Sequence, residues 1–174
     1  ISGYVITVSL ARRERKNFLY FISSFFIRRI KKLIPPQIIF VLFFSFLLLI
    51  LVPQTGASLK TAITSLFSFS NIYLFNNATD YFAQENDLNV FMHTWSLGVE
   101  VQFYLIFPFI VWFTRFSRKN HNSSKQLLIT ITILSIISLI SFIYSYQNNE
   151  SAAYFLPHNR FWEIAMGCIT FLLI

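Results

Sequence analysis

Long apolar runs alternate with polar stretches along this chain, and their lengths predict membrane helices. A helix needs about 20 mostly apolar residues to cross a bilayer, and three runs reach or approach that length: about 33–52, 96–113 and 127–146. Residues 1–10 and the run that begins near Phe161 are apolar but shorter. We therefore predict an all-α, polytopic membrane protein with about five membrane segments, the first and last of them truncated.

Basic residues divide the polar stretches into two kinds. Residues 12–32 and 115–125 hold 12 of the 14 Lys and Arg residues, whereas residues 53–95 and 147–160 hold one each. Cytoplasmic loops of membrane proteins are enriched in Lys and Arg. We therefore predict that the first two stretches are cytoplasmic and that the other two face outward, which makes successive apolar runs cross in opposite directions.

Composition favours a membrane protein over a nucleic-acid-binding one. The chain is 55% hydrophobic and 12% charged, whereas an average soluble domain is about 25% charged. The net charge of +7 comes mainly from basic stretches beside apolar runs, so membrane lipids, and not nucleic acid, are the expected partners. No repeat or change in composition divides residues 1–174, and Cys168 is the single cysteine. We predict one partial membrane domain without a disulfide framework.

Residues 57–75 fit this topology only if they do not cross the membrane. They contain Lys60 and many Ser and Thr residues, which is typical of an amphipathic segment at a membrane surface. We predict that the segment either lies on the outer interface or re-enters the membrane from that side. The polar, acidic residues 76–89 that follow are predicted to form an exposed outer loop.

The stretch HTWSLGVEVQFYLIF (93–107) places polar residues in the first turns of a predicted membrane helix. Side chains three or four positions apart share a helix face. One face then carries His93, Ser96, Glu100, Tyr104 and Phe107, and another carries Trp95, Val99 and Gln102. A charged group at membrane depth costs about 2.5–3.5 kcal/mol on insertion scales, so Glu100 indicates a cavity or a partner. The alternative is a carboxylate that reaches water and is stabilised by the helix dipole.

A second candidate stretch, YFLPHNRFWEIAMG (154–167), opens the last apolar run. Arg160 and Glu163 are three positions apart, so they can form an ion pair at a helix end, and Trp162 is typical of an interfacial anchor. Alternatively, Arg160, Glu163 and His158 line one outer cavity with the carboxylate of the previous stretch, because both predicted helices begin on the outer side.

A third stretch, FFIRRIKKLIPP (25–36), carries a cluster of cations at the predicted cytoplasmic end of the second run. The cluster consists of Arg28, Arg29, Lys31 and Lys32. The two prolines fall in the first predicted turn, where proline is tolerated. One hypothesis is an anchor on anionic lipid, and the other is a phosphate site, because Arg and Lys donate well to phosphate oxygens.

Four stretches in this order resemble the integral-membrane acyltransferase-3 family, and in particular its lipopolysaccharide O-antigen O-acetylases. They are SGYVIT, FFIRRIKKLIP, HTWSLGVEVQFYLIFP and YFLPHNRFWEIAMG. The resemblance implies a multi-pass protein of the bacterial inner (cytoplasmic) membrane. Such a protein transfers an acyl group, usually acetyl from acetyl-CoA, to a hydroxyl of an extracytoplasmic glycan. Acyl-CoA is then a co-substrate, and no bound cofactor or metal is expected.

The resemblance also implies roles for single residues. The cations Arg28, Arg29, Lys31 and Lys32 would bind the acyl-CoA donor, although Lys31 and Lys32 stand where the family has arginines and lack the guanidinium fork. Glu100 would be catalytic, with His93 a weaker candidate. The acceptor-side cavity would be lined by Trp95, Gln102, Tyr104, Arg160, Trp162 and Glu163.

The resemblance further implies that a part of the family domain is absent from this sequence. The family's catalytic histidine lies on a first membrane helix that would precede Ile1, and the C-terminal half would follow Ile174. We therefore expect this stretch alone to be inactive. Two other function classes stay open on the residues alone: a transporter or flippase-like permease, which also places carboxylates in a membrane cavity, and a membrane anchor or assembly subunit.

Overall fold

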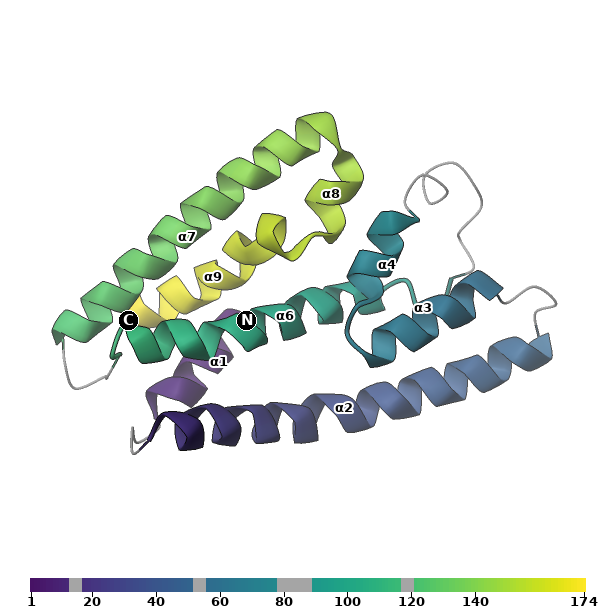
Figure 1. Ribbon diagram of the computed structural model, residues 1–174, viewed down its shortest axis with the longest axis horizontal. Helices are drawn as coiled ribbons and strands as arrows, with labels where there is room; N and C mark the ends of the chain where they lie inside the picture. The colour runs from purple at the N-terminus through teal and green to yellow at the C-terminus, as the bar shows by residue number, and fades with distance from the viewer. Residues whose placement is uncertain (13–16, 52–55, 78–88, 117–120) are drawn as a thin grey trace.

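The computed structural model describes residues 1–12, 17–51, 56–77, 89–116 and 121–174. Within these ranges the regular structure is entirely helical (Figure 1), which confirms the predicted all-α class. The helices are α1 (Ser2–Ala11), α2 (Phe18–Leu51), α3 (Gly56–Leu66), α4 (Ser70–Asn76), α6 (Thr94–Phe113), α7 (His121–Asn148), α8 (Glu150–Phe155) and α9 (Pro157–Leu173). By length and composition, α2, α6 and α7 are able to cross a membrane.

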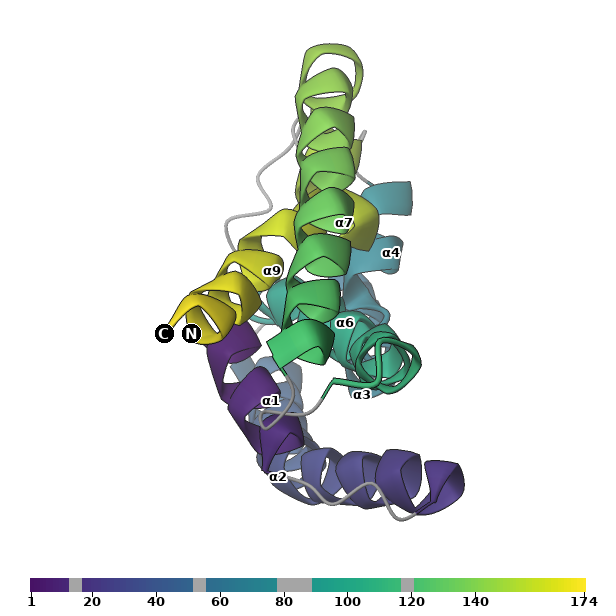
Figure 2. The same cartoon turned by 90° about the vertical axis from the view of Figure 1, so that its left-hand side faces the viewer.

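The long helices alternate in direction. In Figure 1, α2 runs from left to right, α6 returns to the left, α7 runs to the right again and α9 returns. The short helices α3, α4 and α8 therefore gather at one end of the molecule, and the end of α6 and the start of α7 lie at the other. Figure 2 shows α6 between α2 on one side and α7 with α9 on the other. This is the alternation that the charge pattern predicts.

The start of α2 differs from the prediction. The sequence predicts a basic loop that ends near residue 32 and a helix from 33 to 52, but the helix begins at Phe18 and carries the cations within it. Phe21 and Phe25, one turn apart, are buried, so this basic segment is amphipathic and packs as helix. At about 1.5 Å per residue, the 34 residues of α2 extend about 50 Å, well beyond the roughly 30 Å of a bilayer core.

Two short helices occupy most of the segment 57–75. Helices α3 and α4 have 11 and 7 residues, so neither reaches the roughly 20 residues that a crossing needs. Ser68 lies in the turn between them with a φ of 59°. Helix α3 packs against α2, and α4 packs against α6. The chain thus turns back at this end of the molecule, as expected for a segment that does not cross; of the predicted outer loop, residues 78–88 lie outside the described part.

Helix α1 packs very closely against α9. A Cβ atom on Gly3 would lie 1.9 Å from the carbonyl oxygen of Ile164, and one on Gly167 would lie 2.8 Å from the backbone nitrogen of Tyr4. Only glycine at these two positions allows α1 and α9 to approach each other this closely. The buried thiol of Cys168 lies 3.4 Å from the carbonyl oxygen of Gly3. This contact fixes the first turn of α1, which contributes a residue to the site described next.

Candidate active site

Both oxygens of the Glu100 carboxylate accept hydrogen bonds from hydroxyl groups. The Ser2 hydroxyl, from α1, donates to Oε1 at 2.6 Å. The Tyr104 hydroxyl, one turn further along α6, donates to Oε2 at 3.0 Å. Charge-assisted O–H···O bonds are among the stronger protein hydrogen bonds, so the carboxylate is held in one orientation. The pairing of Glu100 with Tyr104 agrees with the helix face predicted from the sequence.

Arg29 approaches the same tyrosine from α2. Its guanidinium carbon lies 5.2 Å from the centre of the Tyr104 ring and 5.7 Å from the centre of the Phe25 ring. Tyr104 is only 6% exposed. A cation over an aromatic ring contributes from about 0.5–1 kcal/mol when exposed to about 2 kcal/mol when desolvated. Ser2, Arg29, Glu100 and Tyr104 therefore form one group between α1, α2 and α6, here called the polar cluster.

The polar cluster revises the predicted layout of the site. The sequence assigns the cations to the cytoplasmic end and Glu100 to the outer end, with most of a membrane between them. In the structure α2 begins 15 residues earlier than predicted, and its first half lies beside α6. Phe18 contacts Trp112, with ring centres 5.3 Å apart, and Arg29 comes level with Tyr104 near the middle of α6. The two motifs therefore meet near the middle of α6.

The four cations of α2 differ in their surroundings. Arg29 is partly buried and points toward α6, whereas Arg28, Lys31 and Lys32 are exposed. The Nε of Arg28 donates to the carbonyl oxygen of Ser24, at 3.1 Å, one turn back along the same helix. The exposed cations therefore lie on faces of α2 that the described residues leave uncovered, and they remain available to an anion.

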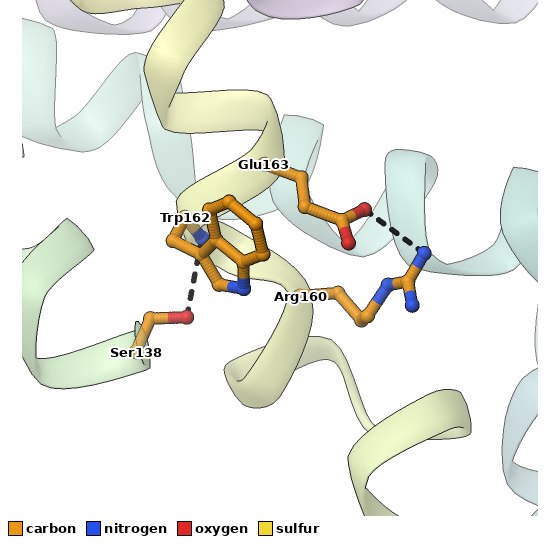
Figure 3. A network of polar contacts seen from close by, with 4 residues as sticks. All are labelled: Ser138, Arg160, Trp162 and Glu163. Carbon is orange, nitrogen blue, oxygen red and sulfur yellow. Dashed lines mark hydrogen bonds and ion pairs between the residues drawn. The ribbon is translucent and has the colours of Figure 1, made fainter. Parts of the chain in front are cut away.

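A second group of side chains surrounds Arg160 at the start of α9. The guanidinium carbon lies 5.2 Å from the ring centres of both Trp95 and Tyr154, and those two rings are 5.1 Å apart. Arg160 also forms an ion pair with Glu163 at 3.0 Å (Figure 3). The ion pair is one of the two arrangements that the sequence leaves open for Arg160 and Glu163, and it is present in the structure. Tyr154, which no sequence pattern singles out, joins the group because α8 folds back onto the start of α6.

Trp162 and Gln102 lie apart from this group. Trp162 points to the other side of α9 from Arg160 (Figure 3), where its backbone N–H donates to the Ser138 hydroxyl at 3.1 Å. The side chain of Gln102 exchanges hydrogen bonds with Asn71 of α4, at 3.0 and 3.3 Å. Trp162 thus contacts α7 and Gln102 fastens α4 to α6. The sequence gives no sign of the role of Asn71, because a single Asn in a mixed polar segment carries no periodic signal.

His93 and His158 are exposed. His93 precedes α6 and its carbonyl oxygen accepts from the Ser96 hydroxyl at 3.0 Å. The carbonyl oxygen of His158 accepts from Ser138 at 2.6 Å, and its side chain is exposed. Over the described residues, neither imidazole forms a hydrogen bond or an ion pair with Glu100. The polar cluster thus contains a carboxylate, two hydroxyls and a guanidinium, and no histidine.

A cavity of about 370 Å³ opens between α6, α7 and α9. Its walls are mainly apolar and include Val99, Phe103, Ile106, Leu134, Ile137 and Phe161. Its volume lies within the range of about 300–1,000 Å³ that is usual for small-molecule sites. Gln102 and Ser138 add polar atoms to the lining, but they are already bonded to α4 and α9, so the cavity offers apolar contact more than charge.

The fold and the polar cluster define an integral membrane protein with an ionisable site inside its helix bundle. The sequence profile of the acyltransferase domain family (Acyl_transf_3) matches residues 1–173, and the chain belongs to this family. The O-acetyltransferase OatA of Staphylococcus aureus strain NCTC 8325 / PS 47 is 32% identical over 171 residues, which cover 97% of this chain and 28% of that protein. OatA of strains COL and MRSA252 matches with the same identity and coverage. The chain thus spans about 28% of the length of these relatives. No solved structure matches it.

Proposed function

We propose that this chain forms part of a membrane-bound O-acyltransferase that moves an acyl group, acetyl in the first instance, from acyl-CoA to a hydroxyl of an extracytoplasmic glycan. The observation that carries the proposal is the polar cluster: Glu100 is held by two hydroxyls beside an arginine, within a helix bundle. Membership of the acyltransferase family and relatives named O-acetyltransferase support the reaction type. The same family membership favours a transferase over a permease.

The reaction places defined demands on such a cluster. The acceptor oxygen attacks the thioester carbonyl carbon, so a C–O bond forms, the C–S bond breaks, and the hydroxyl proton must leave. A carboxylate can accept that proton or orient the group that does, which is the role proposed for Glu100. Negative charge that develops on the carbonyl oxygen is stabilised by fixed donors or cations. The leaving thiolate then takes up a proton and is released as CoA.

The exposed cations of α2 are the proposed donor site. Arg28, Lys31 and Lys32 lie near the polar cluster along α2 and are exposed, and Arg and Lys side chains donate well to phosphate oxygens. An acyl-CoA whose phosphates bind there would extend its thioester toward α6. No bound cofactor is needed for this reaction, because the acyl group arrives with its own activated leaving group.

The group around Arg160 is the proposed acceptor side. Aromatic rings such as Trp95 and Tyr154 suit the apolar face of a sugar ring, and Arg160 and Glu163 can hydrogen-bond its hydroxyls. These residues lie at the end of the molecule where α8 joins α9, which the charge pattern assigns to the outer face. We propose the bacterial cytoplasmic membrane as the location, with an outward-facing polysaccharide, such as lipopolysaccharide O-antigen, as the acceptor class.

Radiolabel transfer tests the proposal. Membranes that contain the full-length protein are incubated with acetyl-labelled acetyl-CoA and with glycan from the same cells, and ester-bound label in the glycan is measured after mild alkaline release. Membranes from cells without the protein are the control. Label that depends on the protein and is released by alkali is the expected result. If the protein binds acetyl-CoA but moves no label to any glycan or water, the proposal is wrong.

A further inference from the structure

We infer that Arg29 is a positioning residue that acts on Glu100 through Tyr104, and that it is not a fourth phosphate ligand beside Arg28, Lys31 and Lys32. The inference rests on the proposed acyl transfer and makes it more specific, because it divides the cationic motif into two roles. It separates one partly buried arginine, which belongs to the polar cluster, from three exposed cations.

Tyr104 bridges the cation and the carboxylate. Its ring face meets the Arg29 guanidinium at 5.2 Å, and its hydroxyl donates to Glu100 at 3.0 Å. Over the described residues, no ion pair joins Arg29 to Glu100 directly. A positive charge beside a phenol makes the hydroxyl a stronger donor, so Arg29 strengthens the bond that holds the carboxylate. Because a tyrosine has only two side-chain torsions, contacts at both ends fix its position.

The surroundings of Arg29 differ from those of its neighbours. Arg29 follows Phe25 by one turn and lies above that ring as well, at 5.7 Å, and Phe25 is completely buried. Arg29 thus lies on the face of α2 that packs into the protein, whereas Arg28 is exposed. One residue along a helix turns a side chain by about 100°, from 3.6 residues per turn. This rotation is enough to give adjacent arginines separate environments.

The two roles predict different kinetics. A cation that binds the donor's phosphates lowers the donor KM, whereas a residue that only orients a catalytic group acts on kcat. A small displacement of a catalytic group can cost about 10²-fold in rate. Arg29 should therefore affect the rate at saturating acyl-CoA, and Arg28 should affect the concentration of acyl-CoA that is needed.

The test uses the full-length protein in membranes, with acetyl-CoA titrated at saturating acceptor. Arg29→Gln is compared with Arg28→Gln, which is the same chemical change one position away. We expect Arg29→Gln to lower kcat by about 10²-fold with the acetyl-CoA KM within about twofold of the parent, and Arg28→Gln to raise KM. Tyr104→Phe should lower kcat as well, and the Arg29→Gln/Tyr104→Phe double variant should be no worse than the poorer single variant. Arg29→Lys, which keeps the charge, should recover part of kcat.

A second measurement is independent of turnover. Dicyclohexylcarbodiimide modifies membrane carboxyl groups in their protonated form, and mass spectrometry locates the adduct. Loss of either Arg29 or Tyr104 should increase modification of Glu100, and Arg28→Gln should not. A raised KM in Arg29→Gln, or unchanged modification of Glu100, would overturn the inference. If the parent protein transfers no acetyl group, the proposed function fails, and the modification assay alone decides the role of Arg29.

Discussion

Tyr104 contacts both Glu100 and Arg29, through its hydroxyl at 3.0 Å and through its ring at 5.2 Å. These two partners come from sequence motifs that are 71 positions apart. Tyr104 therefore joins the cationic motif on α2 and the acidic motif on α6 in one site.

Replacement of Glu100 tests whether its carboxylate has a catalytic or a structural role. We expect Glu100→Gln in the full-length protein to lower acyl transfer by about 10²–10⁴-fold, the usual contribution of general acid–base catalysis. If the carboxylate only complements the helix dipole, its loss costs about 0.3–1 kcal/mol of stability and little activity. Transfer rate and membrane abundance are measured together.

The matched control for this change is Glu150→Gln, which alters an exposed carboxylate at the start of α8. It should leave both the transfer rate and the abundance unchanged. A Glu100→Gln protein with near-normal turnover would return Glu100 to a structural role. In that case Glu163 becomes the next carboxylate to test.

The sidedness of α7 can be measured directly. Asn148 and Lys125 are exposed residues near opposite ends of this helix, and the charge pattern predicts that Asn148 faces outward. Single cysteines at these positions, in a Cys168→Ala background, should react differently with an impermeant maleimide on intact cells. We expect labelling at 148 alone, and labelling at 125 only after the cells are opened. The opposite pattern would invert the predicted topology.

Much of this fold can be predicted from the sequence, because membrane helices are recognisable by the length and low polarity of their apolar runs. The ends of α6, predicted as 96–113, lie within two residues of those observed, since an apolar run and a turn of polar residues mark them. The start of α2 is harder to predict, because its cluster of cations is typical of a loop, whereas the buried Phe21 and Phe25 show that the segment is an amphipathic helix.

The site was predictable only in part, for a different reason. The i, i+4 contact of Glu100 with Tyr104 follows from helix geometry. The contacts of Ser2 with Glu100 and of Arg29 with Tyr104 depend on tertiary packing. Ser2 carries no signal of its own within an apolar run. Its position depends on the close approach of α1 to α9 at Gly3, which no local pattern specifies.

That close approach gives a third prediction. A Cβ on Gly3 would lie 1.9 Å from a backbone oxygen of Ile164, and backbone cannot rotate away as a side chain can. We expect Gly3→Ala to lower the unfolding free energy by about 1–3 kcal/mol, the usual cost of overpacking, and to weaken the Ser2 contact with Glu100. Thermal unfolding in detergent measures the loss. Gly56→Ala, where the new atom meets open space, should leave stability unchanged, and an equal effect in both variants would contradict the packing argument.

The Asn71–Gln102 pair gives a fourth prediction. Each amide hydrogen-bonds the other, and Gln102 also donates to the carbonyl oxygen of Ser68 at 3.2 Å. Asn71→Ala leaves Gln102 with part of its hydrogen bonding unmet, which costs about 1–3 kcal/mol when the group is buried. Asn71→Ala and Gln102→Ala should each destabilise the protein, and the double variant should cost less than their sum. Additive losses would mean that the two residues act separately and would leave Gln102 available for an acceptor.

The last prediction concerns Arg160, which lies over the rings of Trp95 and Tyr154 and is paired with Glu163. Removal of a charged hydrogen-bonding group from a binding site costs about 1.5–3 kcal/mol, or about tenfold to a hundredfold in affinity. If Arg160 binds the acceptor glycan, Arg160→Ala should raise the acceptor KM by that factor and leave the acetyl-CoA KM unchanged. Lys60→Ala removes an exposed cation of α3 on the same predicted side and should change neither value. If the Arg160→Ala protein is less abundant but has an unchanged acceptor KM, Arg160 serves the packing of α8 and α9 against α6 and does not bind the acceptor.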